Sequence, residues 1–390
     1  MVFLGISLGV YGLYFLFVLR QNKAIFSFQN TLLKLQEENS SDESKLQDVS
    51  IIVSTYNEAK VIARKIENLS ELNYPKQRME IIVFDDSSSD GTADIAEKTI
   101  QERQLFGKVV RNSPRMGLNR SLNAAVTGAR NNLICITDSD VLLEKNSLRN
   151  AVSVLQNFKD AGGVTGHIQP VFEGKGMAQA TEISYRGFYH DSMLSESALH
   201  SAFPGNGPLI VYNKMETPSP IPADYGSTDG NIAMNIIKKG LRFIYVPNAI
   251  VYEPEAENLE DQRLQKVRRA KRLLQVFLHN MDIGFNQKYG YFGSRIFPLK
   301  LMMMSLSPIL FLVGSILTAL GIIFSQNLMI YALTGIMLIG ALVVFSVSKK
   351  LGSFFSSFVL HQLYLIAGLL QASRKSVFWK TIDRKTKISS

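Results

Sequence analysis

The chain has 390 residues, a hydrophobic fraction of 46% and a formal net charge of +9. This length is enough for one large domain and a second region. The excess of positive charge suits a membrane surface or a phosphate-bearing ligand, and charge alone does not choose between them. Cys135 is the only cysteine, which excludes a disulfide framework within the chain and fits a reducing, cytosolic environment. Because Cys135 lies in an apolar run, we expect it to pack in the core.

The N-terminal segment is predicted to be a membrane anchor. Residues 2–19 are almost wholly apolar and uncharged, and Arg20 and Lys23 follow them. About 20 apolar residues span a bilayer, and a basic flank on the C-terminal side places the chain that follows in the cytoplasm. A secretory signal peptide is the alternative, but it requires a basic start and a small-residue cleavage site, which this segment lacks. The polar residues that follow, up to residue 48, are predicted to be a linker.

The central part of the chain alternates between strand-like and helix-like segments. Short β-branched runs occur at residues 49–54, 79–84, 108–111, 132–137, 163–168, 208–212 and 242–246. Helical stretches separate most of them, and this alternation predicts an open, mostly parallel α/β sheet.

The C-terminal third is predicted to contact the membrane. Residues 258–280 form a basic amphipathic stretch of the kind that lies on a membrane surface, with Leu264 and Leu274 on its apolar face. A solvated helix with one charged face fits the same pattern. Three apolar runs follow, at residues 301–324, 328–347 and 353–371. Three spans would place the basic tail outside, against the positive-inside rule, so we expect that one run, by preference the third, does not cross and that the tail is cytoplasmic.

Acidic and amide side chains follow three of the predicted strands. In a parallel α/β sheet, ligands bind beyond the carboxyl ends of the strands. The side chains in these positions belong to Thr55, Tyr56, Asn57 and Glu58 after the first strand, to residues 85–92 after the second, and to Asp138 and Asp140 after the fourth. So many carboxylates at one edge repel one another unless a cation or a hydroxyl-rich ligand compensates for them.

Asp138 and Asp140 are the sharpest feature of this edge. Two carboxylates at i and i+2, just past a strand, can reach one hard cation such as Mg²⁺ or Mn²⁺, which prefers oxygen ligands and usually shares itself with substrate phosphates. Turn formation and helix capping by short acidic residues are the alternative explanation. For residues 85–92, a turn that starts a helix competes with nucleoside recognition by a carboxylate.

Together these elements resemble the large family 2 of glycosyltransferases, and the resemblance runs from residue 49 to about residue 275. Residues 54–58 resemble the family's opening Tyr-Asn-Glu motif, and residues 85–92 (Asp-Asp-Ser-Ser-Ser-Asp-Gly-Thr) are similar to its nucleotide-binding loop. Asp138 and Asp140 match its metal-binding pair. The resemblance implies a GT-A fold, a Rossmann-like α/β domain, and the apolar runs predict transmembrane helices at both ends of it.

Residues 117–125 resemble the family's Gly-Lys-x-x-Ala-Leu-Asn segment, with Leu118 in place of the usual lysine. A phosphate contact is therefore missing or is supplied by Arg115 or Arg120. The resemblance implies that the donor contacts Thr55, Tyr56, Asn57, Glu58, Asp85, Asp86, Asn119, Asp138, Arg268 and Arg269.

Residues 227–230 (Ser-Thr-Asp-Gly) resemble the family's Glu-Asp motif, with Thr228 in the position of the glutamate. The resemblance makes Asp229 the general base, because an alcohol is a poor nucleophile until a carboxylate takes its proton. An ordinary carboxylate at a helix N-terminus is the alternative. The turn of Gly205, Asn206 and Gly207 resembles the family's glycine turn near the acceptor, where a plain loop is the other interpretation.

Residues 265–269 resemble the Gln-x-x-Arg-Trp motif of membrane-bound members, with Arg269 in place of the tryptophan. By resemblance, Gln265 and Thr228 join the glycine turn on the acceptor side. Arg268 suits the donor pyrophosphate, because a guanidinium pairs well with phosphate oxygens. The missing tryptophan weakens the case for processive polymer synthesis.

The resemblance implies an inverting, metal-dependent transfer of a sugar from a nucleotide sugar, by preference a UDP-sugar, to a lipid-linked or glycan acceptor at the membrane surface. Two alternatives stay open: a processive polysaccharide synthase, and a non-catalytic membrane protein that binds glycans or nucleotide sugars. A dinucleotide-dependent oxidoreductase is disfavoured because no Gly-x-Gly-x-x-Gly turn follows the first strand. Nucleic-acid binding would leave the apolar runs unexplained. The sugar, the acceptor and the oligomeric state are not determined by the sequence.

The expected regions are an anchor at 1–20, a linker at 21–48, a catalytic domain at 49–257, a basic interfacial region at 258–298, transmembrane helices at 299–372 and a basic tail at 373–390.

Overall fold

The computed structural model describes residues 2–40, 45–172, 177–217, 220–254, 259–325 and 349–375, together with residues 327, 329, 331, 332, 335 and 336. Most of the apolar run expected at 328–347, and the basic tail from residue 376 onwards, therefore lie outside the described residues.

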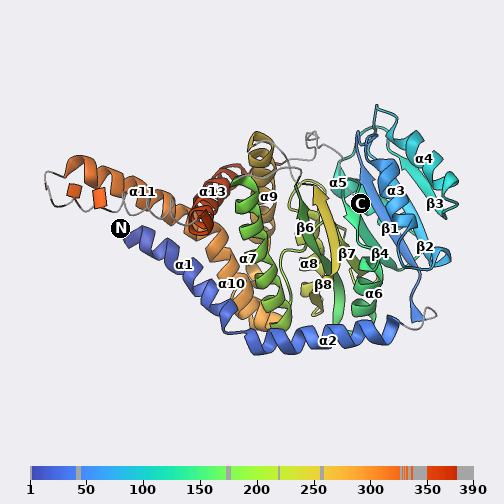
Figure 1. The fold of residues 1–390 in the computed structure, drawn as a ribbon, viewed down its shortest axis with the longest axis horizontal. Coiled ribbons are helices and arrows are strands. Elements are labelled where there is room, and N and C mark those ends of the chain that lie inside the picture. Colours follow the sequence, from blue (N-terminus) through green and yellow to red (C-terminus); the bar gives the residue numbers. More distant parts are fainter. Residues whose placement is uncertain are drawn as a thin grey trace.

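An eight-stranded sheet lies at the centre of the globular part (Figure 1). Its order is β3-β2-β1-β4-β7-β6-β8-β5. The strands are β1 (Val49–Thr55), β2 (Met79–Asp85), β3 (Gly107–Arg111), β4 (Leu133–Asp138), β5 (Leu142–Leu143), β6 (Ala161–Val171), β7 (Ile210–Asn213) and β8 (Arg242–Pro254). The first four are mutually parallel, and β7 is antiparallel to both of its neighbours. The predicted mostly parallel sheet is confirmed, and the two-residue β5 is the strand that the sequence pattern did not indicate.

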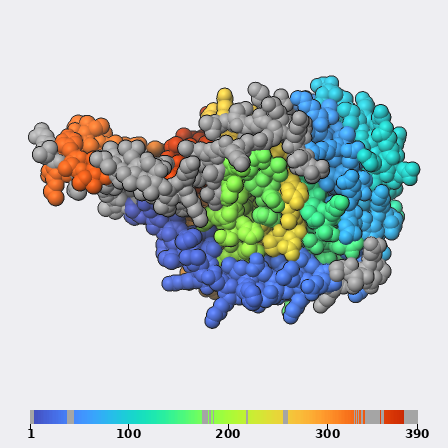
Figure 2. Space-filling model, in the orientation of Figure 1, coloured from blue at the N-terminus to red at the C-terminus, as the bar shows by residue number. Residues whose placement is uncertain are grey.

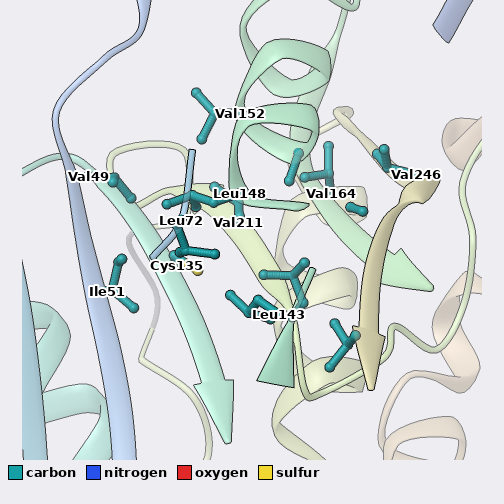
Figure 3. Packing of buried hydrophobic residues seen from close by; sticks show 14 of the residues in the cluster. Val49, Ile51, Leu72, Cys135, Leu143, Leu148, Val152, Val164, Val211 and Val246 are labelled. Carbon is teal, nitrogen blue, oxygen red and sulfur yellow. The ribbon is translucent and has the colours of Figure 1, made fainter. Parts of the chain in front are cut away.

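Helices cover both faces of the sheet, because its strands carry apolar residues on both sides. In β1, Val49, Ile51 and Val53 point into one hydrophobic cluster and Ile52 into the other. Buried Cys135 packs with Ile51 and Leu143 in the first cluster, as expected for a core residue (Figure 3). The helices that contribute to the first cluster are α2 (Asn22–Ser40), α3 (Ile62–Ser70), α4 (Thr92–Glu102), α6 (Ser147–Asn157) and α7 (Met177–Leu199). The second cluster receives α5 (Leu118–Gly128), α8 (Thr228–Lys238) and α9 (Leu259–His279).

The segment expected to be a linker is mostly helical. Helix α2 occupies Asn22–Ser40 and runs along one side of the globular part (Figure 1). Phe28 and Leu32, four residues apart on one helical face, are buried in the core. Residues between two regions were expected to be irregular because of their polarity, but these apolar side chains attach the segment firmly to the domain.

The terminal helices form an extension that projects from the globular part (Figures 1 and 2). Helix α1 (Val2–Leu19) packs against α11 (Ser307–Phe324), where the hydroxyls of Ser7 and Ser307 lie 2.8 Å apart. Helix α11 continues from two π-helical turns (Phe292–Ile296 and Met302–Leu306) and the short α10 (Phe297–Leu301). Short 3₁₀ turns occur at Lys76–Arg78, Met281–Ile283 and Gln287–Tyr289.

One helix of the described residues, Phe292–Phe324, is long and apolar enough to cross a membrane. In α1 the qualifying apolar stretch, Gly5–Leu19, is shorter than a span. The third apolar run forms α13 (Lys349–Gln371), which packs on α9 and α7. Transmembrane helices at both ends therefore remain a proposal.

Candidate active site

The carboxyl ends of β1, β2 and β4 meet at one edge of the sheet. Thr55 pairs with Asp85 across β1 and β2, and Ser54 pairs with Asp138 across β1 and β4. The parallel register thus brings the three groups that follow separate strands to the same edge of the sheet, as predicted.

Asp138 ends β4, and Asp140 follows in the turn, both half-buried. Among the described residues, no three His, Cys, Asp or Glu side chains converge as a metal site. Two carboxylates are nevertheless a suitable protein contribution for Mg²⁺ or Mn²⁺, because these cations commonly take their remaining ligands from substrate phosphates and water. The donor set therefore fits a metal that arrives with a diphosphate.

The loops after β1 and β2 are joined by hydrogen bonds. The backbone N–H of Asn57 donates to Ser88 Oγ at 2.8 Å, and the N–H of Ser89 donates to Asn57 Oδ1 at 2.9 Å. The N–H of Glu58 donates to Thr92 Oγ1 at 2.9 Å. Asn57 has φ of 53°, in the left-handed region that asparagine tolerates better than most residues. The Tyr-Asn-Glu segment and the nucleotide-loop segment are one structural unit.

Asp85 and Asp86 are both buried, and both accept hydrogen bonds from the protein itself. Asp85 accepts from the N–H of Ser88 at 3.0 Å, which closes its own loop. Asp86 accepts from five groups at 2.7–3.3 Å: Asn112 Nδ2, Arg115 Nε, Met116 N, Gly117 N and Ser121 Oγ. A carboxylate surrounded in this way holds the 112–121 segment in place, so direct contact of either aspartate with a nucleoside stays a prediction.

Arg115 belongs to the same 112–121 segment and places a positive charge near the predicted donor site. Its guanidinium carbon is 3.4 Å from the centre of the Tyr56 ring, a stacked cation–π contact, and its Nε is 3.3 Å from Asp86. Arg115 was one of two arginines expected to supply the phosphate contact of the family's usual lysine, which is Leu118 in this chain, and this role stays a prediction.

Asn119, at the start of α5, connects this helix to α8, the helix of the candidate base. Its Nδ2 donates to the Pro222 carbonyl at 2.7 Å, and its Oδ1 accepts from the Thr228 hydroxyl at 2.8 Å. One turn later, Asn123 forms a pair of hydrogen bonds with the backbone of Ile221. The amide of Asn119, predicted to bind donor, is thus engaged in positioning the start of α8.

Asp229 lies in the first turn of α8. Ser227 caps this helix by accepting from the N–H of Gly230 at 3.2 Å. Burial raises the pKa of Asp229, and hydrogen bonds from Ser227 and the Gly230 N–H oppose the rise. Burial is the main cause of the raised pKa of Tyr189, and the charges of Tyr185 and Asp229 add to it. A carboxylate with a raised pKa accepts a proton more readily near neutral pH.

The basic helix α9 is tied to buried carboxylates. Arg269 pairs with Glu253 at 2.5 Å and Lys266 pairs with Glu182 at 2.6 Å, while Arg186 bridges the two glutamates at 2.9 Å each. Sequence analysis did not predict this network, because α7, β8 and α9 contribute to it from separate parts of the chain. Arg269 was predicted to bind donor, and in the structure Glu253 offsets its charge.

The predicted apolar face of α9 is not continuous. Leu274 is buried, whereas Leu264 and Leu278 are half exposed. Gln265, predicted to contact acceptor, is buried, and Arg268 is half-buried. The helix packs against α13, which the helical spacing alone could not reveal.

The glycine turn at 205–207 packs closely on the sheet. A Cβ on Gly205 would lie 2.9 Å from the Phe243 ring, so the close approach requires glycine. Asn206 donates from its N–H to Thr165 Oγ1 and from Nδ2 to the Gly166 carbonyl, both at 2.7 Å. A small cavity beside the turn is lined by His167, Arg186, Tyr189, His190, Asn206 and Tyr245, among others. Acceptor contacts by Gly205, Asn206 and Gly207 stay a prediction.

Comparison with known proteins shows what the central part of the chain resembles. Residues 50–206 match the sequence model of glycosyl transferase family 2. The chain is 30% identical over 166 residues to the probable glycosyltransferase YdaM of Bacillus subtilis, covering 42% of this chain and 39% of YdaM. It is 30% identical over 131 residues to a dolichyl N-acetyl-alpha-D-glucosaminyl phosphate 3-beta-D-2,3-diacetamido-2,3-dideoxy-beta-D-glucuronosyltransferase of Methanococcus voltae, covering 32% of this chain and 40% of the relative.

A solved structure resembles nearly the whole chain. The mannosyltransferase PcManGT from Pyrobaculum calidifontis, solved with GDP-Man and Mn²⁺, superposes with a TM-score of 0.72 at 23% identity and covers 95% of this chain and 98% of its own. This likeness shows the fold. Residues 50–206 are thus similar to glycosyl transferase family 2, and the chain has the GT-A-like fold that its motifs predicted. The chain spans about two fifths of the length of each of these two curated relatives.

Proposed function

We propose that the protein transfers a sugar from a nucleotide-sugar donor to a lipid-linked or glycan acceptor at a membrane surface. The observation that carries this proposal is the convergence of the Asp138–Asp140 turn with the β1 and β2 loops, together with the direct link from the donor-side Asn119 to the helix of Asp229. A family 2 domain supports a nucleotide-sugar donor. The base of the nucleotide stays open, with UDP-sugars as the first expectation.

In this proposal each residue has a separate task. Tyr56 and Arg115 border the donor, and Asp138 and Asp140 hold Mg²⁺ or Mn²⁺. The metal, when bound, would offset negative charge on the departing nucleoside diphosphate. Asp229 removes the proton from the acceptor hydroxyl, which attacks the anomeric carbon in a single, inverting displacement. The Mn²⁺ bound to PcManGT supports the choice of cation.

The acceptor is proposed to be lipid-linked because the domain carries apolar helices with exposed side chains. Ile316, Leu317 and Leu320 of α11 are 44–50% exposed, and Leu13 and Leu16 of α1 are 59% and 50% exposed. Exposed apolar surface of this extent favours a membrane. The dolichyl phosphate in the name of the Methanococcus voltae relative supports a lipid carrier. Membrane insertion with a cytoplasmic catalytic domain is part of the proposal.

Release of nucleoside diphosphate by the detergent-purified protein tests this function. The panel contains UDP- and GDP-sugars with Mn²⁺ or Mg²⁺ and extracted membrane lipid as acceptor. Metal-dependent release from one donor supports the proposal, and the length of the product on a gel separates single transfer from processive synthesis. Donor binding without release for every acceptor would favour a non-catalytic binding protein.

A further inference from the structure

A fully buried lysine lies behind the turn that carries Asp138 and Asp140. Lys65 belongs to α3, and its relative exposure is 0%. Its ammonium donates to Thr137 Oγ1 at 2.7 Å and to the Val141 carbonyl at 3.1 Å. These acceptors come directly before and directly after the segment from Asp138 to Asp140. One side chain therefore ties the two ends of the turn together.

The burial of Lys65 calls for a compensating charge. Taking an ammonium out of water is costly unless a carboxylate offsets its charge. In the part of the chain that the structure describes, Lys65 forms no direct ion pair, and the carboxylates whose charge acts on it are Asp138 and Asp140. Burial lowers the pKa of Lys65 to about 8, while Cys135 and these two aspartates oppose the shift. The acidic turn and the buried cation thus stabilise each other.

Asn68, a neutral residue on the same helix, forms hydrogen bonds with the chain just beyond the turn. Asn68 donates from Nδ2 to the Leu143 carbonyl at 2.9 Å and accepts from the Leu143 N–H at 2.8 Å. Helix α3 therefore holds this segment at two places, and only the contact nearer the aspartates carries a charge. Asn68 offers a matched control for the loss of anchoring without a change of charge.

We propose that Lys65 is a positioning residue for the metal-binding turn, which it holds in shape before a divalent cation and the donor arrive. The inference rests on the metal-dependent transfer proposed above. Two carboxylates that must share one cation repel each other in its absence, and a positive charge behind them lowers that repulsion. With both ends of the turn fixed, the carboxylates do not have to be ordered when the metal binds. Partners that orient metal ligands in this way typically contribute about 10–100-fold to metal affinity.

The test measures Mn²⁺ binding to the purified full chain by electron paramagnetic resonance, with and without UDP or GDP. Lys65→Met keeps the length of the side chain and removes its charge and hydrogen bonds, and Thr137→Val removes one acceptor. We expect Lys65→Met to weaken Mn²⁺ binding about 10-fold and Thr137→Val to weaken it less. The double variant should lose less Mn²⁺ affinity than the product of the two single losses, because both substitutions break the same hydrogen bond between Lys65 and Thr137. Asn68→Leu should lower thermal stability and leave Mn²⁺ affinity unchanged.

Unchanged or tighter Mn²⁺ binding by Lys65→Met would overturn the inference, since removing a positive charge without any loss of positioning can only favour a cation. If Lys65→Met does not fold, Thr137→Val gives the answer alone, with normal affinity counting against the inference. Wild-type protein that binds no Mn²⁺, or an Asp140→Asn variant that binds it normally, would instead reject the proposed metal site, and this inference with it.

Discussion

At the scale of single residues, the account depends on Asp229. Burial raises the pKa of this carboxyl, so its protonated form persists to higher pH than in an exposed aspartate. Because burial disfavours the charged form, ionisation of Asp229 lowers the stability of the folded protein. The stabilising contribution of the protonated carboxyl is complete at low pH and is lost as the pH rises through the raised pKa. Activity that needs the ionised base should therefore rise with pH while this contribution to stability falls.

Asp229→Asn should lower kcat by about 10²–10⁴-fold, the usual contribution of a general base, with donor affinity within a few-fold of wild type. The acidic limb of the kcat/KM profile should lie above the pH expected of an ordinary aspartate and should disappear in the variant. The melting temperature at neutral pH should be no lower for the variant than for the wild type. Steady-state kinetics between pH 4 and 9 check this, and retained activity in Asp229→Asn would assign the base elsewhere.

Asn119 and Asn123 allow the positioning of the base to be separated from simple anchoring. Both hold residues 221–222, but only Asn119 also accepts from Thr228 at the start of α8. Replacing either by leucine leaves buried polar groups without a partner, at roughly 1–3 kcal/mol for each group. We expect similar losses of stability and a clearly larger fall in kcat for Asn119→Leu. Equal kcat values for the two variants, measured below their melting temperatures, would contradict a role of Asn119 in placing α8.

At the scale of elements, the contact between α9 and α13 decides how the last helix is attached. A Cβ on Gly368 of α13 would lie 2.8 Å from the Lys271 backbone nitrogen and 2.9 Å from Ala270. Gln275 of α9 then joins the Gly226 N–H, just before the base helix, to the Ala372 carbonyl at the end of α13, both at 2.9 Å. The end of the last helix thus reaches the loop that precedes Asp229.

Gly368→Val should force α13 away from α9 and lower stability by about 1–3 kcal/mol, the usual effect of overpacking. Gly321→Val in α11 is the control, because a Cβ there meets nothing within 4 Å. Thermal unfolding in detergent compares the two variants. A melting temperature for Gly368→Val equal to that of the Gly321 control would mean that the helices do not pack as described.

The sequence predicts elements well where local pattern dominates. The strands at Val49–Thr55 and Leu133–Asp138 were evident because β-branched runs end in polar residues, and parallel register then brings their ends together. What local pattern could not show was long-range pairing. Three sets of contacts join segments that are separate in sequence. They are the ion pair of Arg269 with Glu253, the five hydrogen bonds that Asp86 accepts, and the hydrogen bonds of Lys65 at the ends of the Asp138–Asp140 turn. The helix α2 was missed because its few buried side chains are diluted by polar ones.

At the scale of the whole molecule, the globular domain and the apolar extension are proposed to face different solvents. Introducing lysines at Ile316 and Leu320, both exposed on α11, should reduce the fraction of protein that resists alkaline extraction from membranes, since a charge at mid-membrane costs about 2.5–3.5 kcal/mol. Phe106→Lys, at an exposed apolar residue of the globular part, should leave extraction unchanged. Equal extraction of all three proteins would argue against insertion of α11.

The central claim is that Asp138 and Asp140 support metal-dependent transfer from a nucleotide sugar, and one measurement addresses it directly. Nucleoside diphosphate release is followed against Mn²⁺ concentration for wild type and Asp140→Asn, with each donor of the UDP- and GDP-sugar panel and membrane lipid as acceptor. The account predicts release from one donor that saturates with Mn²⁺ and is lost or needs far more Mn²⁺ in the variant. Release from wild type that chelation does not affect, or that Asp140→Asn retains in full, would contradict it.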